Sequence, residues 1–446
     1  MATTKVTGYN VKDIRFPTSL EKDGSDAMNT APDYSAPYLT LKTDSHLEGH
    51  GITFTLGKGN KIVCHAIDVL VKMVIGKKLS DIYSNFGSFW RTLTSEDQMR
   101  WLGPEKGVMH LAVAAIINAL WDLWAKMEGK PLWKLLVDME PEQLVSTIDF
   151  RYMADALTKD EALAILKSMQ AGKKERESEV ISKGVPAYTT TVGWLGYSDE
   201  KLRRLCKEAL AGGWTKFKAK VGADLKDDIR RLTIIREEIG PDNILLVDAN
   251  QRWEVQESID WMKELAKFKI TWIEEPTSPD DILGHGEIAK ALNPLGIGVA
   301  TGEACQNRVM FKQFLKSHAL QYCQIDSCRL GGVNENLAVI LMAKKYNVPV
   351  CPHGGGVGLC ELIQHLATFD LIAVSGNLES RMVEFADHLS EHFINPCVVK
   401  NGHYVVPQAI GYSMDMKESS LQDHEYPTGK VWQKLIADGI CIADDV

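Results

Sequence analysis

The sequence predicts an α/β fold in which a parallel barrel of repeated β/α units follows a smaller α+β domain. At 446 residues the chain exceeds one small core and suits a large domain with a second, smaller one. From about residue 186 to residue 385, short apolar runs alternate with helical patterns. Charged residues follow these runs at nearly even intervals, namely at Lys220, Asp248, Glu274, Glu303, Asp326, His353 and Glu384. Each interval, about 23 to 31 residues, matches one strand–loop–helix–loop unit, so these side chains are expected at the C-terminal mouth of a barrel.

The first 150 residues predict strands and then helices. Strand patterns cover residues 11–16, 38–44 and 49–57. A polar loop rich in Gly, Ser, Asp, Asn and Pro runs from Thr18 to Tyr34, and loops of this length often serve as lids or binding loops. Residues 62–138 follow a helical pattern. Strands followed by helices predict an α+β domain over residues 1–150.

The rest of the chain divides into three parts. Residues 151–185 are polar and highly charged, and they predict a helical insertion at the domain junction. The barrel is expected over residues 186–385, beginning with the strand AYTTTVGW. In the tail, 386–446, VVKNGHYVVP predicts a strand and VWQKLIADG a helix. The tail is expected to fold back on the first domain and complete it.

The composition excludes several classes of protein. A net charge of -9 argues against nucleic acid or an anionic membrane as the main partner. The nine cysteines show no CxxC spacing and predict buried free thiols rather than a zinc site or a disulfide framework. The N-terminal segment has no apolar signal-peptide core, and no apolar run is expected to approach the length needed to cross a bilayer. The expected protein is soluble and intracellular, in the cytoplasm or the mitochondrion.

Three carboxylates at the ends of consecutive predicted strands indicate a metal site. Asp248, Glu274 and Glu303 would converge at the barrel mouth without a thiolate or imidazole between them. Oxygen ligands of this kind favour a hard divalent cation, Mg²⁺ before Zn²⁺. Glu275 follows Glu274 directly and should point the other way along the strand, so it is left out of the metal site.

Two lysines and a histidine complete the candidate site. Lys218 and Lys220 are two residues apart on one predicted strand, so both face the same side, where they suit an anionic substrate. Beside a cation, one of the two amines is expected to have a pKa low enough for it to act as a base. Asp326 and His353 end the next two predicted strands, where the carboxylate can orient the imidazole for proton transfer.

These motifs resemble those of the enolase superfamily, mandelate racemase subgroup, over nearly the whole chain. The matching segments are ALWDLWAKMEGKPLWKLL, KAK, VDAN, IEEP, TGE, IDSCRLGG and CPHGG. Within the subgroup, the loop RFPTSLEKDGSDAMNTAPDYSA, the GPEKG stretch, the GKKERE segment and ANQRW are most similar to those of L-fuconate dehydratases. The resemblance implies an N-terminal capping domain on a modified (β/α)7β TIM-type barrel.

The resemblance also implies roles for the site residues. Mg²⁺ would be held by Asp248, Glu274 and Glu303. Lys220 would remove the C2 proton of L-fuconate to form a metal-stabilised enediolate, and His353, paired with Asp326, would act as general acid on the departing C3 hydroxyl. The product would be 2-keto-3-deoxy-L-fuconate. Lys218 would contact the substrate carboxylate, and the other implied substrate contacts are Asn250, Glu384, Gly24, Ser25, Asp26 and Tyr34. A homo-oligomer is expected, with no nucleic-acid or membrane partner.

Three alternatives stay open at this point. In the first alternative, the substrate is an aldonate other than L-fuconate, because the loop geometry that selects hydroxyl stereochemistry does not follow from the sequence. Alternatively, the protein is a racemase or epimerase, since the same lysine and histidine can exchange the C2 proton without loss of water. A third alternative, disfavoured by the acidic balance and the complete set of charged residues, is a barrel that mainly binds a protein or nucleic-acid partner.

Overall fold

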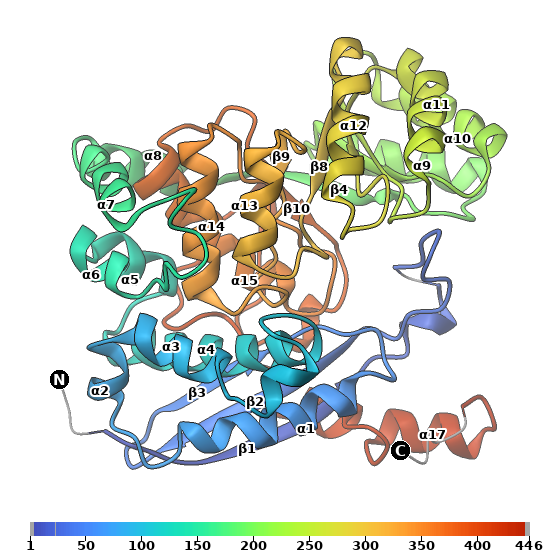
Figure 1. The fold of residues 1–446 in the computed structure, drawn as a ribbon. Helices are drawn as coiled ribbons and strands as arrows, with labels where there is room; N and C mark the ends of the chain where they lie inside the picture. Colours follow the sequence, from blue (N-terminus) through green and yellow to red (C-terminus); the bar gives the residue numbers. More distant parts are fainter. Residues whose placement is uncertain (1–3, 23, 442–446) are drawn as a thin grey trace.

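The computed structural model describes residues 4–22 and 24–441. Residues 1–3, 23 and 442–446, which belong to the predicted first domain, its polar loop and the tail, lie outside the described residues. Figure 1 shows a blue and cyan N-terminal domain packed below a barrel whose helices run from green to orange. The predicted fold class is confirmed, and the elements follow in chain order.

An antiparallel sheet of order β1-β2-β3 begins the chain (Val6–Arg15, Ser35–Thr43 and Glu48–Ile52). Its register places Val11 opposite Leu39 and Leu39 opposite Gly51. A Cβ atom at Gly51 would lie only 1.9 Å from the carbonyl oxygen of Ala115, so glycine allows the next long helix to approach the strand closely. The three strands predicted for this region are confirmed.

Six α-helices follow the sheet among the described residues of this region, and the fourth forms its core. They are α1 (Asn60–Leu70), α2 (Leu79–Tyr83), α3 (Phe86–Thr94), α4 (Gly107–Met127), α5 (Leu132–Asp138) and α6 (Pro141–Ser146). By length and composition α4 passes as a membrane span, so the expectation that no apolar run is long enough is wrong for this segment. However, 89% of its most apolar window is buried inside the protein, which identifies α4 as a core helix.

Two charged helices occupy residues predicted as a helical insertion, α7 (Lys159–Ser168) and α8 (Lys173–Lys183). Thr158 and Glu161 form a capping box at the start of α7. Lys345 binds Glu161 at 2.7 Å, and Arg176 donates to the carbonyl of Ile372 at 2.8 Å. These bonds attach both helices to the outer surface of the barrel.

The barrel strands are parallel and each is followed by a helix until the last. The strands are β4 (Val185–Gly193), β5 (Lys216–Lys220), β6 (Ile244–Asp248), β7 (Ile270–Glu274), β8 (Gly298–Thr301), β9 (Tyr322–Cys323) and β10 (Val383–Phe385). The helices are α9 (Asp199–Ala211), α10 (Leu225–Ile239), α11 (Val255–Leu265), α12 (Ile282–Leu292), α13 (Arg308–Lys316), α14 (Val333–Lys345) and α15 (Leu359–Phe369). Pairing of β10 with β4 brings the two ends of the barrel together.

The seventh position of the barrel differs from the prediction, because residues 349–353 are not a regular strand. This segment nevertheless joins its neighbours: Cys351 donates its N–H to the carbonyl of Cys323 at 2.8 Å. On the other side, Glu384 donates to the carbonyl of Pro352 at 3.1 Å. Pro349 and Pro352 lack an N–H group, so a complete hydrogen-bond ladder cannot form here.

The tail packs on both domains. The hairpin of β11 (Val399–Lys400) and β12 (His403–Tyr404) pairs with β4 of the barrel, so the expectation that the whole tail folds onto the first domain is wrong for these residues. Helices α16 (Glu418–His424) and α17 (Lys430–Ala437) do reach the first domain, where Trp432 donates to the carbonyl of Arg15 at 2.9 Å. Figure 1 shows α17 beside the blue strands.

A buried ion cluster joins the barrel to the first domain. Arg308, at the start of α13, binds Glu105 at 2.9 Å and Glu335 at 3.0 Å. His110 of α4 contacts the other carboxylate oxygen of Glu335 at 2.5 Å. Burial raises the pKa of Glu335, but His110 and Arg308 outweigh it and lower the pKa to about 2. The carboxylate is therefore charged in the folded protein at neutral pH.

Glu335→Gln is expected to lower the free energy of unfolding at pH 7 by about 3 kcal/mol, because it removes the buried carboxylate charge that Arg308 and His110 share. Since the folded-state pKa is depressed, this contribution is present above the unfolded pKa of about 4.3 and is lost as the pH falls towards 2. Urea denaturation of both proteins between pH 3 and pH 7 measures the difference. Glu237→Gln, which removes an exposed partner of Arg203, should cost less than about 1 kcal/mol. Equal losses for the two variants would contradict the assigned role of the cluster.

Candidate active site

Strand register brings the first three charged residues side by side. Lys220, Asp248 and Glu274 are the last residues of β5, β6 and β7. Lys220 is paired with Asp248, and Asp248 with Glu274, across the parallel ladder. Since neighbouring residues on one rung project to the same side of the sheet, their side chains meet at the barrel mouth.

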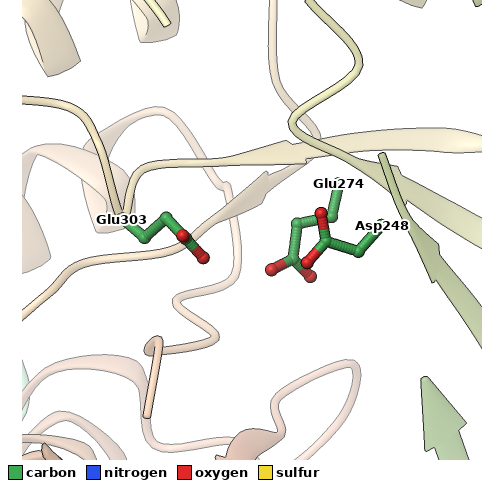
Figure 2. Close-up of side chains that lie close together, drawn as sticks. All are labelled: Asp248, Glu274 and Glu303. Carbon is green, nitrogen blue, oxygen red and sulfur yellow. The ribbon is translucent and has the colours of Figure 1, made fainter. Parts of the chain in front are cut away.

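Glu303 reaches the same place from the loop after β8. It lies two residues beyond the strand, after Gly302, whose φ is +148°. A Cβ atom at Gly302 would lie 2.2 Å from the carbonyl oxygen of Gln324, so only glycine fits at this turn. Figure 2 shows the carboxylate of Glu303 pointing towards those of Asp248 and Glu274.

The three carboxylates fit a divalent cation. One oxygen from each of Asp248, Glu274 and Glu303 lies within 4.8 Å of the others. Burial raises the pKa of Glu274 to about 8, with Asp248, Glu384 and Glu303 adding to the effect and Lys218 opposing it. Converging carboxylate oxygens whose charges repel one another are the donor set that Mg²⁺ binds in proteins.

Lys218 and Lys220 share a strand face but have different surroundings. Lys220 lines the cavity described below, and its Nζ lies 2.6 Å from Oδ2 of Asp248. Lys218 is only 1% exposed and lies behind the cavity wall, with Nζ 2.7 Å from both Glu274 and Glu384. The described cavity lining includes neither Lys218 nor its neighbours Asp248 and Glu274, so contact of Lys218 with the substrate carboxylate stays a prediction.

Without a cation, the pKa of both lysines is raised, so the lowered pKa expected beside a bound cation stays a prediction. Burial alone would lower the pKa of Lys220, but the attraction of Asp248 outweighs it and raises the pKa above the ordinary value. Burial is likewise outweighed at Lys218, chiefly by Glu274 and then Glu384, and its pKa is also raised. The physical reason is that carboxylates outnumber amines around β5.

His353 is held by Asp326 and faces Glu303. Its Nδ1 lies 2.8 Å from Oδ2 of Asp326, and its Nε2 lies 3.3 Å from Oε2 of Glu303. The other oxygen of Asp326 accepts backbone N–H bonds from Cys328 and Arg329, at 2.6 and 2.7 Å, which fixes the carboxylate. Burial opposes protonation of the imidazole, but Glu303 and then Asp326 raise its pKa to about 10. His353 therefore carries a proton at neutral pH.

A cavity of about 490 Å³ opens at the barrel mouth, a size that suits a small-molecule ligand. The predicted residues that line it are Gly24, Asp26, Tyr34, Lys220, Asn250, Glu303, Asp326, His353 and Glu384. Ser25 is not among the residues that line the cavity. Its hydroxyl donates a hydrogen bond to the carbonyl of Lys22 at 2.8 Å. Sequence reasoning missed several lining residues, including Asn29, Phe54, Thr190, Trp194, Gln306, Arg329 and His388. Thr190 lies within β4 and the others stand in loops, and none of them belongs to the pattern of charged strand ends.

The loop between β1 and β2 supplies one wall of this cavity. Gly24 has a φ of +77°, and a Cβ atom there would lie 2.3 Å from the hydroxyl oxygen of Tyr34. Asp26 accepts backbone N–H bonds from Met28 at 2.7 Å and Asn29 at 2.6 Å, which holds the loop in shape. The Tyr34 ring packs edge-on against Phe54 at 5.0 Å. The first domain therefore closes one side of a site whose charged groups come from the barrel.

Comparisons with known proteins agree with this arrangement. Residues 20–137 match the "Mandelate racemase / muconate lactonizing enzyme, N-terminal domain", and residues 201–420 match "Enolase C-terminal domain-like". Human "Mitochondrial enolase superfamily member 1" is 60% identical over 98% of this chain and 99% of its own length. Its crystal structure has a TM-score of 0.96, covering 97% of this chain and 98% of the solved one.

One further relative is named for an enzymatic activity, and one further solved structure contains a bound metal ion. "L-galactonate dehydratase" of Hypocrea jecorina is 56% identical over 96% of each chain. A racemase from Streptomyces coelicolor, whose structure has bound magnesium, has a TM-score of 0.71 at 24% identity. It covers 92% of this chain and 96% of its own, and this likeness concerns the fold.

Proposed function

Since this chain belongs to the mandelate racemase/muconate lactonizing enzyme family of the enolase superfamily, we propose that it is a Mg²⁺-dependent dehydratase of a six-carbon sugar acid. The observation that carries the proposal is a single cavity lined by two candidate proton-transfer groups. Lys220 and His353 both line it, together with Glu303 of the carboxylate cluster. A base for C2 and an acid for the C3 oxygen are the groups that loss of water requires.

Asp248, Glu274 and Glu303 would hold the cation, because their oxygens converge. When bound, Mg²⁺ would neutralise these carboxylates and stabilise the negative charge that develops on the substrate carboxylate. The positive charge that it adds beside Lys220 also favours the neutral amine, which can accept a proton.

Two proton transfers complete the reaction. Lys220 takes the proton from C2, and His353 gives its proton to the C3 hydroxyl as the C3–O bond breaks, so one water leaves. The enol product then tautomerises to a 2-keto-3-deoxy acid. Asp326 holds His353 in place through its Nδ1, which leaves Nε2 directed towards Glu303 and the cavity.

Other side chains bind and orient the substrate. Asn250 and Glu384 line the cavity and would contact the sugar acid, as would the loop residues Gly24, Asp26 and Tyr34. Lys218, which pairs with Glu274 and Glu384, would contact the substrate carboxylate. Ser25, which donates to the carbonyl of Lys22, would contact the sugar acid together with the rest of the loop.

L-Fuconate is the proposed substrate, and L-galactonate is the second candidate. The loop and insertion segments favour L-fuconate, whereas the relative from Hypocrea jecorina is named for L-galactonate. The two acids differ only at C6, where L-fuconate carries a methyl group and L-galactonate a hydroxymethyl group. Both therefore suit the same proton-transfer groups.

Metal removal tests the proposal directly. The purified protein should form a 2-keto-3-deoxy acid from one of these acids with Mg²⁺, and excess chelator should lower the rate about 10²- to 10³-fold, which re-added Mg²⁺ restores. Colorimetric detection of the keto acid over a panel of aldonates measures this. Deuterium exchange at C2 with no keto acid from any aldonate would instead favour the racemase or epimerase.

The domain boundaries, the oligomeric state and the cellular location are part of the same proposal. Domain boundaries near residues 150 and 385 separate a capping domain from the barrel, with α16 and α17 of the tail contributing to the cap. A homo-oligomer in the cytoplasm or mitochondrion, with a sugar acid as its partner, fits the expectations from the sequence. The human relative is named for the mitochondrion.

A further inference from the structure

His388 lies on the wall of the cavity and has unused hydrogen-bonding capacity. It follows β10, in the loop beyond Phe385. Among the described residues, neither Nδ1 nor Nε2 of His388 has a hydrogen-bond partner, and both atoms are buried. Within the described part of the chain, His388 and Asn250 are the cavity-lining residues whose side chains carry buried polar atoms without a hydrogen-bond partner. A buried polar group without a partner is costly, so such an atom in a cavity points to a ligand.

The surroundings of His388 fix its ring without satisfying its nitrogens. Its ring centroid lies 4.9 Å from that of Tyr34 and 5.9 Å from that of Trp194, which meets it edge-on. Tyr34 in turn packs on Phe54 and contacts Gly24. His388 therefore belongs to the wall that the β1–β2 loop completes.

Its charge state suits an uncharged polar partner. Burial lowers the pKa of His388 to about 4, against the opposing influence of Glu391 and then Glu384. The imidazole is therefore neutral at pH 7, with one nitrogen as donor and the other as acceptor. An alcohol is also both donor and acceptor, whereas a carboxylate only accepts.

We propose that His388 is a specificity-determining residue that hydrogen-bonds a hydroxyl group on the distal part of the sugar acid, beyond C3. This rests on the proposed function, because it assumes that the carboxylate end occupies the metal site and the chain extends towards the β1–β2 loop. His388 thereby acts in substrate selection rather than in proton transfer. It couples the barrel to the loop of the first domain through Tyr34.

His388→Phe tests this, because phenylalanine keeps a ring against Tyr34 and Trp194 but removes both nitrogens. The measured quantities are the dissociation constants of L-galactonate and L-fuconate with Mg²⁺, by titration calorimetry, together with KM and kcat. We expect the dissociation constant and KM to rise about tenfold for at least one acid, with kcat changed less than about threefold. His388→Gln, which keeps one donor and one acceptor, should recover part of the affinity and serves as the second variant if the phenylalanine does not fit.

Each outcome decides a specific point. A loss confined to L-galactonate supports the proposal and identifies the C6 hydroxyl, whereas equal losses support it and identify a hydroxyl that both acids share. Unchanged dissociation constants for both acids in both variants, with thermal stability preserved, overturn it and leave His388 as a packing residue.

The wild-type protein separates this proposal from the proposed function. If it binds the acids without forming keto acid, the proposed dehydration is contradicted, while the role of His388 is still tested by binding. If the wild-type protein binds neither acid, both proposals fail.

Discussion

Lys220→Ala is expected to reduce sugar-acid dehydration by about 10⁴-fold, because it removes the group proposed to take the C2 proton. In this structure the Lys220 amine lies at the end of β5, 2.6 Å from Asp248, and lines the cavity. Exchange of the C2 proton in deuterated water should be lost together with keto-acid formation. Proton NMR of the sugar acid measures the exchange, and a colorimetric assay measures the product.

The control for this variant lies on the same strand. Lys216 begins β5, at the opposite end from the cavity, so Lys216→Ala removes the same charge and should leave both rates within about twofold. Mg²⁺ binding, measured by calorimetry, should survive in Lys220→Ala, because the three carboxylates remain. Persistent C2 exchange in a folded Lys220→Ala protein that binds Mg²⁺ would assign the base to another residue.

His353→Asn is expected to lower dehydration by about 10³- to 10⁴-fold while C2 exchange continues at a measurable rate. The proposed acid acts on the C3 oxygen, after Lys220 has taken the C2 proton, so its loss blocks departure of water and not proton removal. In this structure, which holds no cation, Glu303 and then Asp326 raise the pKa of the imidazole to about 10. Asparagine cannot donate an equivalent proton. Parallel NMR and keto-acid assays separate the two steps.

His318→Asn is a suitable control for this change. His318 is exposed beyond the end of α13 and has a φ of +54°, a conformation that asparagine tolerates well. Its activity should equal that of the wild-type protein. Normal dehydration by His353→Asn would mean that a different group protonates the leaving hydroxyl. Loss of exchange and dehydration together would instead indicate that His353 also takes part in removing the C2 proton.

Much of the fold follows from local pattern. The three N-terminal strands and the alternating barrel units were predictable because side-chain periodicity and β/α unit length depend on residues close in sequence. The seventh barrel segment was harder, since Pro349 and Pro352 break the ladder while the chain still holds its place through bonds to Cys323 and Glu384. The β11–β12 hairpin joins β4 by pairing His403 with Pro186 and Tyr404 with Val185, and no local signal specifies a pairing between residues so far apart in the chain.

Local sequence pattern was enough to predict that Lys220, Asp248 and Glu274 end barrel strands and so meet at the barrel mouth. Parallel strands of similar length bring their C-terminal ends to one face, so even spacing was sufficient for Asp248, Glu274 and Lys220. The three-dimensional structure was needed to show that Lys218 is enclosed by Glu274 and Glu384, whereas Lys220 reaches the cavity. It alone placed His388 against Tyr34, because that contact joins a loop of the first domain to one beyond the last barrel strand. Burial and charge balance depend on neighbours from distant parts of the chain, and sequence spacing carries no record of them.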